Sequence, residues 1–148
     1  MRTPRTIQEI LEAFEEHAAL FLEAGIEKGE VLPGELIEYF AGDTPTGDVT
    51  TLDDVIANRW LLLHEVTELK HLKLKGIEIT REVVWERFVD VLEAHFAATA
   101  VELKMALKYN DKAWIKKRLS MMPLWLEDSN IPDRLRIACR SLIEHYSI

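Results

Sequence analysis

The sequence contains a single cysteine, Cys139, among 148 residues. One cysteine excludes a disulfide within the chain and any zinc site built from several cysteines, and it suits a reducing compartment. No apolar run approaches the roughly twenty residues that a membrane-spanning helix needs. Residues 1–5 also lack the apolar core of a secretion signal. These shortages predict a cytoplasmic protein without a membrane span.

Amide side chains are scarce as well, with one Gln and three Asn against 26 acidic residues. This bias is typical of proteins from thermophiles. Strand patterns are also missing, because no stretch alternates polar and apolar residues for long enough, and residues 76–80 are too few to count. A chain of this length that is 48% hydrophobic can bury one core. We therefore expect a single domain over residues 1–148.

The sequence does contain apolar residues at helical spacing, bounded by start and stop signals. Pro and Gly residues mark the ends of segments, and Gly, Pro, Thr and Asp between residues 42 and 51 predict a loop without the lysine of a phosphate-binding loop. The pattern predicts an all-α bundle of about five to six helices. They are a first helix from a capping box at 6–9 to Gly25, a short one after Pro33, two long ones at about 52–75 and 81–109, a shorter one through 113–119, and a last one from 132 to about 146.

Charge is unevenly distributed along the chain. The net charge is −8, with thirteen acidic and three basic residues in 1–58 but thirteen acidic and fifteen basic residues in 59–148. A nucleic-acid-binding protein is usually basic overall, which makes nucleic acid an unfavoured partner in spite of the basic stripe at 104–118. We expect instead that the acidic first helices lie near the basic later ones, either within one chain or between subunits.

The third predicted helix carries His64, Glu68 and His71 within a sector of about 60°. Carboxylate and imidazole groups at this spacing can hold a divalent metal ion such as zinc or manganese. Glu65 lies beside them and could accept a proton. The alternative is a solvated surface of histidines and carboxylates.

The fourth predicted helix places His95 and Glu102 on its apolar face, in line with Trp85 and Leu92. A carboxylate that faces a core must be paired, protonated or bound to a metal. His95 and Glu102 lie two turns apart on the same side, so they could share a partner on another helix. The alternative is an ion pair between Glu102 and an Arg or Lys.

Segment 64–71 departs from several known metal-binding patterns. Its fifth position is Glu68 rather than the second histidine of a zincin, and ferritin-like bundles need two Glu-x-x-His pairs where this chain has one. The MazG-type pyrophosphatases pair a Glu-x-x-Glu with a Glu-x-x-Asp, but segment 86–90 is one residue too long for the second half. Glu65 stands where HD-type phosphohydrolases need Asp. The sequence is therefore assigned to no family.

Two function classes remain open from the sequence. The favoured one is a self-associating or partner-binding protein, with residues 121–125 as a candidate contact patch. The alternative is a metal-dependent hydrolase of phosphate esters or nucleotides that uses zinc, manganese or magnesium. Its predicted metal ligands are His64, Glu68, His71 and His95, and its predicted catalytic residues are Glu65 and Glu102.

Overall fold

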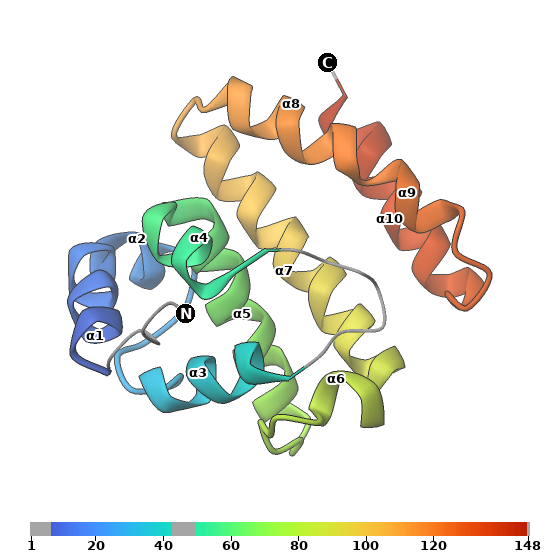
Figure 1. Cartoon of the computed structure of the whole chain (residues 1–148). Helices are drawn as coiled ribbons and strands as arrows, with labels where there is room; N and C mark the ends of the chain where they lie inside the picture. The colour runs from blue at the N-terminus through green and yellow to red at the C-terminus, as the bar shows by residue number, and fades with distance from the viewer. Residues whose placement is uncertain (1–6, 43–49, 148) are drawn as a thin grey trace.

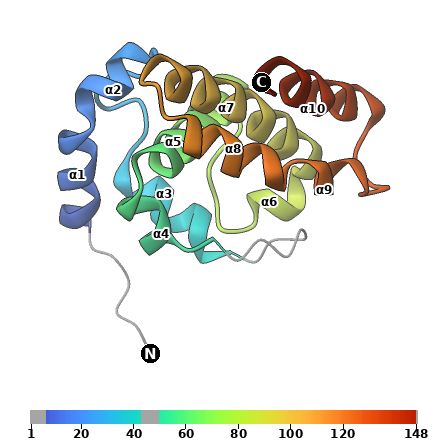
Figure 2. The same cartoon turned by 90° about the horizontal axis from the view of Figure 1, so that it is seen from above.

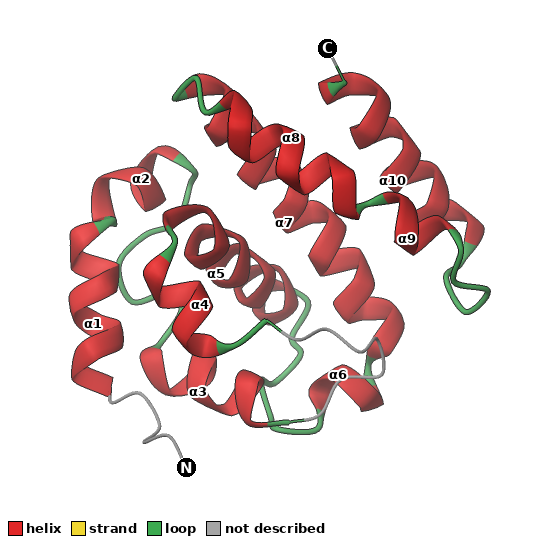
Figure 3. Cartoon of the chain, turned by 45° about the horizontal axis from the view of Figure 1, so that its top comes forward, coloured by secondary structure: helices red, strands yellow, loops and turns green. Residues whose placement is uncertain are grey.

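The computed structural model describes residues 7–42 and 50–147, and all regular structure within these ranges is helical (Figure 3). The all-α prediction is confirmed. No helix in the described ranges is long and apolar enough to cross a membrane. The predicted capping box at Thr6 and most of the predicted loop lie outside the described residues. The helices are α1 (Ile7–Glu16), α2 (Ala18–Glu23), α3 (Pro33–Ala41), α4 (Leu52–Ala57), α5 (Arg59–Leu74), α6 (Val83–Glu86), α7 (Phe88–Lys108), α8 (Lys112–Met121), α9 (Pro123–Leu126) and α10 (Asp133–Tyr146).

Helices α5 and α7 form the centre of the molecule and run antiparallel to each other (Figure 1). Helices α1–α4 lie on one side of this pair and α8–α10 on the other, as the view from above also shows (Figure 2). Because neighbours cover α5 from several directions, its buried residues are spread around the helix. They are Trp60, Leu62, Leu63, His64, Val66, Glu68, Leu69 and Leu72. Each large apolar side chain buried here contributes about 1.5–3 kcal/mol.

Both long predicted helices are interrupted in the structure. Asn58 is extended (φ −134°, ψ 120°), and its side-chain oxygen accepts hydrogen bonds from the backbone N–H groups of Trp60 and Leu61, so a new helix starts there. Arg87 (φ −126°, ψ 43°) separates α6 from α7. This second break changes the helical phase. As a result Trp85, which the periodicity places in the core, is 58% exposed.

The end of α7 reverses the chain. Asn110 takes a left-handed conformation (φ 58°), which Asn tolerates better than most residues. Asp111 then caps α8 by accepting a hydrogen bond from the backbone N–H of Trp114 at 3.1 Å. The turn brings α8 back along α7 (Figure 1). Side chains of α8 can therefore reach the middle of α7.

Acidic residues of the first helices pair with basic residues of the later ones within the chain. Three such pairs are Lys70–Glu30 at 3.0 Å, Lys73–Glu35 at 2.8 Å and Lys108–Glu23 at 2.8 Å. The first two pairs are partly buried, whereas the exposed Lys108–Glu23 pair belongs to a class that contributes about 0–1 kcal/mol. The uneven charge distribution is thus partly compensated inside one molecule.

Candidate metal centre

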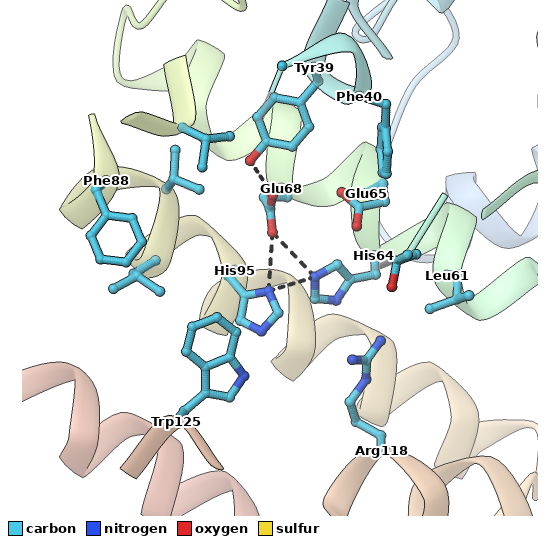
Figure 4. A pocket seen from close by; sticks show the side chains of 15 residues that line it. Tyr39, Phe40, Leu61, His64, Glu65, Glu68, Phe88, His95, Arg118 and Trp125 are labelled. Carbon is cyan, nitrogen blue, oxygen red and sulfur yellow. Dashed lines mark hydrogen bonds and ion pairs between the residues drawn. The ribbon is translucent and has the colours of Figure 1, made fainter. Parts of the chain in front are cut away.

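Two histidines and a glutamate from the central helices converge on one point (Figure 4). His64 and Glu68 lie one turn apart on α5, and His95 faces them from α7. The Nε2 atom of His64 is 3.1 Å from Nδ1 of His95 and 3.3 Å from Oε1 of Glu68. The same Glu68 oxygen is 3.4 Å from His95 Nδ1. Three potential ligand atoms therefore form a nearly equilateral triangle.

The size of this triangle suits a single cation. Zinc binds histidine nitrogen and carboxylate oxygen at about 2.0–2.1 Å with tetrahedral geometry, which places neighbouring ligand atoms about 3.3 Å apart. The measured separations of 3.1–3.4 Å bracket that value. The two-histidine, one-carboxylate donor set is also one that manganese and iron accept. The separations of the three atoms therefore fit their sharing one ion.

Glu102 on α7 fixes the orientation of the His64 ring. Its side chain is fully buried, and its Oε1 lies 2.8 Å from His64 Nδ1. The other oxygen accepts hydrogen bonds from Trp114 Nε1 at 2.6 Å and from Arg118 Nε at 2.8 Å. With Nδ1–H donating to this carboxylate, His64 Nε2 is directed at the convergence point. A histidine ligand in a metal site commonly has such a carboxylate behind it.

Tyr39 on α3 holds the second oxygen of Glu68. Its buried hydroxyl donates a hydrogen bond to Glu68 Oε2, which leaves Oε1 facing the two histidines. Burial and the Glu68 charge raise the pKa of Tyr39 well above its ordinary value, so the hydroxyl keeps its proton. Glu68 is thereby prepared to offer one oxygen to a cation.

The protonation states of the three residues differ. Burial lowers the pKa of His64, but the hydrogen bonds to Glu102 and Glu68 outweigh burial and raise it to about 10. Burial lowers the pKa of His95, and the nearby His64 charge adds to this effect. Burial raises the pKa of Glu68, yet its bonds to the two histidines lower it overall. The raised pKa favours the protonated form of His64, so a cation that bound Nε2 would have to displace a proton.

The cluster lies at the wall of a cavity of about 310 Å³. Phe88 and Trp125 line one side of the cavity, while Glu65 and Arg118 lie on the opposite side (Figure 4). Helices α3, α5, α6, α7, α8 and α9 line the cavity, together with Gly42 after α3 and Thr50 before α4. A ligand in it would therefore meet the converging His64, Glu68 and His95 atoms.

The structure brings together three of the four predicted ligands. His71 is separate, since its Nε2 is 3.6 Å from Glu93 Oε1 and it does not line the cavity. His71 lies almost one helical turn beyond Glu68 on α5, past the point where the other three ligand atoms meet. The solvated-surface alternative is wrong for His64 and Glu68, which are 2% and 5% exposed.

The two predicted catalytic carboxylates occupy different places. Glu65 lines the cavity, whereas Glu102 is buried behind His64 and lines no part of it. Glu102 also forms the alternative that the sequence offered, an ion pair with a basic residue, and this residue is Arg118. Glu102 thus combines both predicted arrangements, because one oxygen faces the histidine and the other faces the guanidinium.

The sequence does not predict that four residues belong to the site, namely Tyr39, Trp114, Arg118 and Trp125. Each comes from a helix other than the two that carry the ligands. The available signal was the four-residue spacing of Trp114 and Arg118, which puts both on one face of α8. That spacing does not reveal which helix the face packs against.

Comparison of the chain with protein-family models, with curated proteins and with solved structures finds no match in any of the three. The fold and the site themselves define a structural class of protein. Within the described residues the protein is an all-α helical bundle whose central helix pair carries a buried cluster of two histidines and a glutamate beside a cavity.

Proposed function

We propose that His64, Glu68 and His95 bind one divalent metal ion and that the protein is a metal-dependent hydrolase of phosphate esters or nucleotides. The observation that carries the proposal is the triangle of ligand atoms 3.1–3.4 Å apart, oriented by Glu102 and Tyr39. Catalytic zinc sites typically use three protein ligands of these types and keep a further position for water.

A metal held in this way would activate a water molecule for attack. Bound zinc can lower the pKa of water to about 7, which produces hydroxide at neutral pH. Glu65 is the carboxylate on the cavity wall that can take the proton. Glu102 is unsuited to that step because both of its oxygens accept hydrogen bonds, so its role is to position His64.

Arg118 supports a phosphate-containing substrate. Its Nε donates to Glu102 and fixes the guanidinium group against the cavity, which it also lines. The fork of N–H donors in a guanidinium group matches phosphate oxygens. An anionic ester could therefore contact the metal and Arg118 together.

The test is the metal content of the purified, untagged protein by plasma mass spectrometry, with assays of phosphate ester and nucleotide hydrolysis. We expect about one metal ion per chain, lost in His64→Ala and in His95→Ala. His71→Ala is the matched control, since His71 lies on α5 outside the cavity, and should keep both metal and activity. A metal-free protein whose melting temperature is unchanged by zinc, manganese or magnesium would overturn the proposal.

Partner binding is a second candidate function, supported by exposed apolar side chains at the junction of α8 and α9. Met121 is 40% and Leu124 is 69% exposed. The sequence patch 121–125 is divided, however, because Met122 is buried and Trp125 packs on His95. Sedimentation equilibrium of the protein and of Leu124→Glu tests it. Self-association that the variant abolishes would favour this candidate, and a monomer at high concentration would exclude self-association.

A further inference from the structure

The two sides of the cavity differ in chemistry. Phe88 and Trp125 present aromatic rings on one side of the His64–Glu68–His95 cluster, and Glu65 and Arg118 present opposite charges on the other, beside Phe40 and Leu61 (Figure 4). A ligand that spans the cluster could therefore place an apolar group against Phe88 and Trp125 and an anionic group against Arg118. The metal proposal explains the convergence of the ligands but does not use the aromatic side.

Trp125 is held in place by its neighbours. Its ring centroid lies 4.9 Å from that of His95 with a tilt of 47°, and the Phe96 ring meets it edge-on at 5.8 Å and 77°. The indole is nevertheless only half-buried and forms part of the cavity wall. A fixed aromatic surface of this kind favours stacked or edge-on contact with another ring.

The cavity limits the size of the ligand. Its volume of about 310 Å³ is close to the lower end of the range of about 300–1,000 Å³ that is common for small-molecule sites. A mononucleotide or an aryl-substituted phosphate is of the right scale. A folded nucleic acid or a protein is not.

We infer that the substrate is a small phosphate monoester whose alcohol part carries a planar ring, with the ring against Trp125 and Phe88 and the phosphate between the metal and Arg118. This inference rests on the proposed hydrolase function. In the reaction, Glu65 would take a proton from a water molecule that the metal activates, and the oxygen of that water would form a bond to phosphorus. The bond between phosphorus and the alcohol oxygen would break, and the leaving oxygen would receive the proton from Glu65. The products are the free alcohol and inorganic phosphate.

The experiment compares benzyl phosphate with cyclohexylmethyl phosphate. Both are esters of primary alcohols and are similar in size, but only one carries a planar ring. We measure kcat/KM for both substrates with the metal-loaded protein and with Trp125→Leu and Trp125→Phe, and we measure the metal content of each preparation. Stacking on an aromatic side chain predicts a loss of roughly 5- to 150-fold for benzyl phosphate in Trp125→Leu. We expect little loss for cyclohexylmethyl phosphate and substantial rescue in Trp125→Phe.

The outcomes separate the two proposals. Equal kcat/KM for the two esters, with equal losses in Trp125→Leu at full metal content, would overturn the ring inference and leave the hydrolase proposal standing. Absence of bound metal together with no hydrolysis of either ester would overturn the hydrolase proposal itself. A nucleoside 5′-monophosphate in a third assay identifies the source of the ring. A higher kcat/KM than for benzyl phosphate indicates a nucleobase, and a lower one indicates a simple aryl group.

Discussion

The Nδ1 atom of His64 lies 2.8 Å from Oε1 of Glu102, and both side chains are almost completely shielded from solvent. The carboxylate also receives hydrogen bonds from Trp114 and Arg118. A buried charge is tolerated when it is paired and hydrogen-bonded in this way. The imidazole ring therefore has one favoured orientation, with its other nitrogen directed at His95.

In the proposed metal site, we expect this contact to make Glu102 a determinant of metal affinity. Glu102→Gln keeps the size of the side chain but removes its charge, and we expect metal affinity to fall about 10- to 100-fold. Competition with a chromophoric chelator measures the change. Glu93→Gln is the control, because that carboxylate lies on the same helix but pairs with Lys75 and Arg134. Unchanged affinity in Glu102→Gln would show that the carboxylate does not position His64.

Removing the Tyr39 hydroxyl should destabilise the protein. Tyr39→Phe leaves the buried Glu68 Oε2 without this donor, and an unsatisfied buried acceptor costs about 1–3 kcal/mol. Urea unfolding measures the loss. Tyr109→Phe is the matched control, since the Tyr109 hydroxyl donates to Glu23 at the surface at 2.7 Å. Its effect should stay within about 0.5 kcal/mol. Equal effects of the two substitutions would contradict the importance of the Tyr39–Glu68 bond.

Metal binding should raise the melting temperature. At a free metal concentration 100 times the dissociation constant, the folded state gains about 2.7 kcal/mol. For a domain of this size that corresponds to a rise of roughly 5–10 °C. Differential scanning calorimetry with zinc or manganese, and then with excess EDTA, checks the prediction. The rise should be absent in His95→Ala and present in His71→Ala, and a rise in both variants would place the metal elsewhere.

Asp111 should contribute stability that depends on pH. Its carboxylate accepts hydrogen bonds from Trp60 Nε1 at 2.8 Å and from the backbone N–H of Trp114 at 3.1 Å, and these bonds lower its pKa. A pKa lowered by folding means that the stabilisation is present above the ordinary value of 3.8 and is lost as the pH falls through the folded value. Asp111→Ala should cost about 1 kcal/mol at pH 7, and the difference from the unmodified protein should shrink below about pH 4.

The control for this pH effect is Asp111→Asn. The amide keeps an acceptor oxygen but does not titrate in this range. The stability difference between the Asn and Ala variants should therefore stay constant from pH 7 to pH 3 in chemical denaturation experiments. If the stability difference between the unmodified protein and Asp111→Ala also stays constant from pH 7 to pH 3, this would contradict the lowered pKa of Asp111.

Gly42, at the end of α3, should not accept a side chain. A Cβ atom there would lie 1.8 Å from the backbone oxygen of Arg81, although the φ of −87° suits any residue. Gly42→Ala must therefore move backbone, at a cost of about 1–3 kcal/mol. Gly34→Ala in the same helix is the control, since a Cβ there meets nothing within 4 Å. Thermal unfolding of both variants compares them, and equal stability would refute the close contact.

Helical spacing was sufficient to predict much of the fold and part of the site. It predicted α3 and α10 closely, and it grouped His64 with Glu68 and His95 with Glu102, because residues on one helix face are related by local geometry. The break at Asn58 was missed, since Asn occurs inside helices as well as at their starts. The Glu102 partner could not be chosen, because Arg118 is one of several basic residues in the 104–118 stripe.

The reversal at Asn110 also has a consequence for the order in which the site is assembled. Glu102 is separated from Trp114 by 12 positions and from Arg118 by 16, whereas the His64 contacts to His95 and Glu102 span 31 and 38 positions. Closing a shorter loop costs less chain entropy. The α7–α8 hairpin can therefore pair the Glu102 carboxylate before α5 arrives. We therefore expect His64 to dock against a charge that is already compensated, and the proposed ligands His64, Glu68 and His95 to meet in the last step.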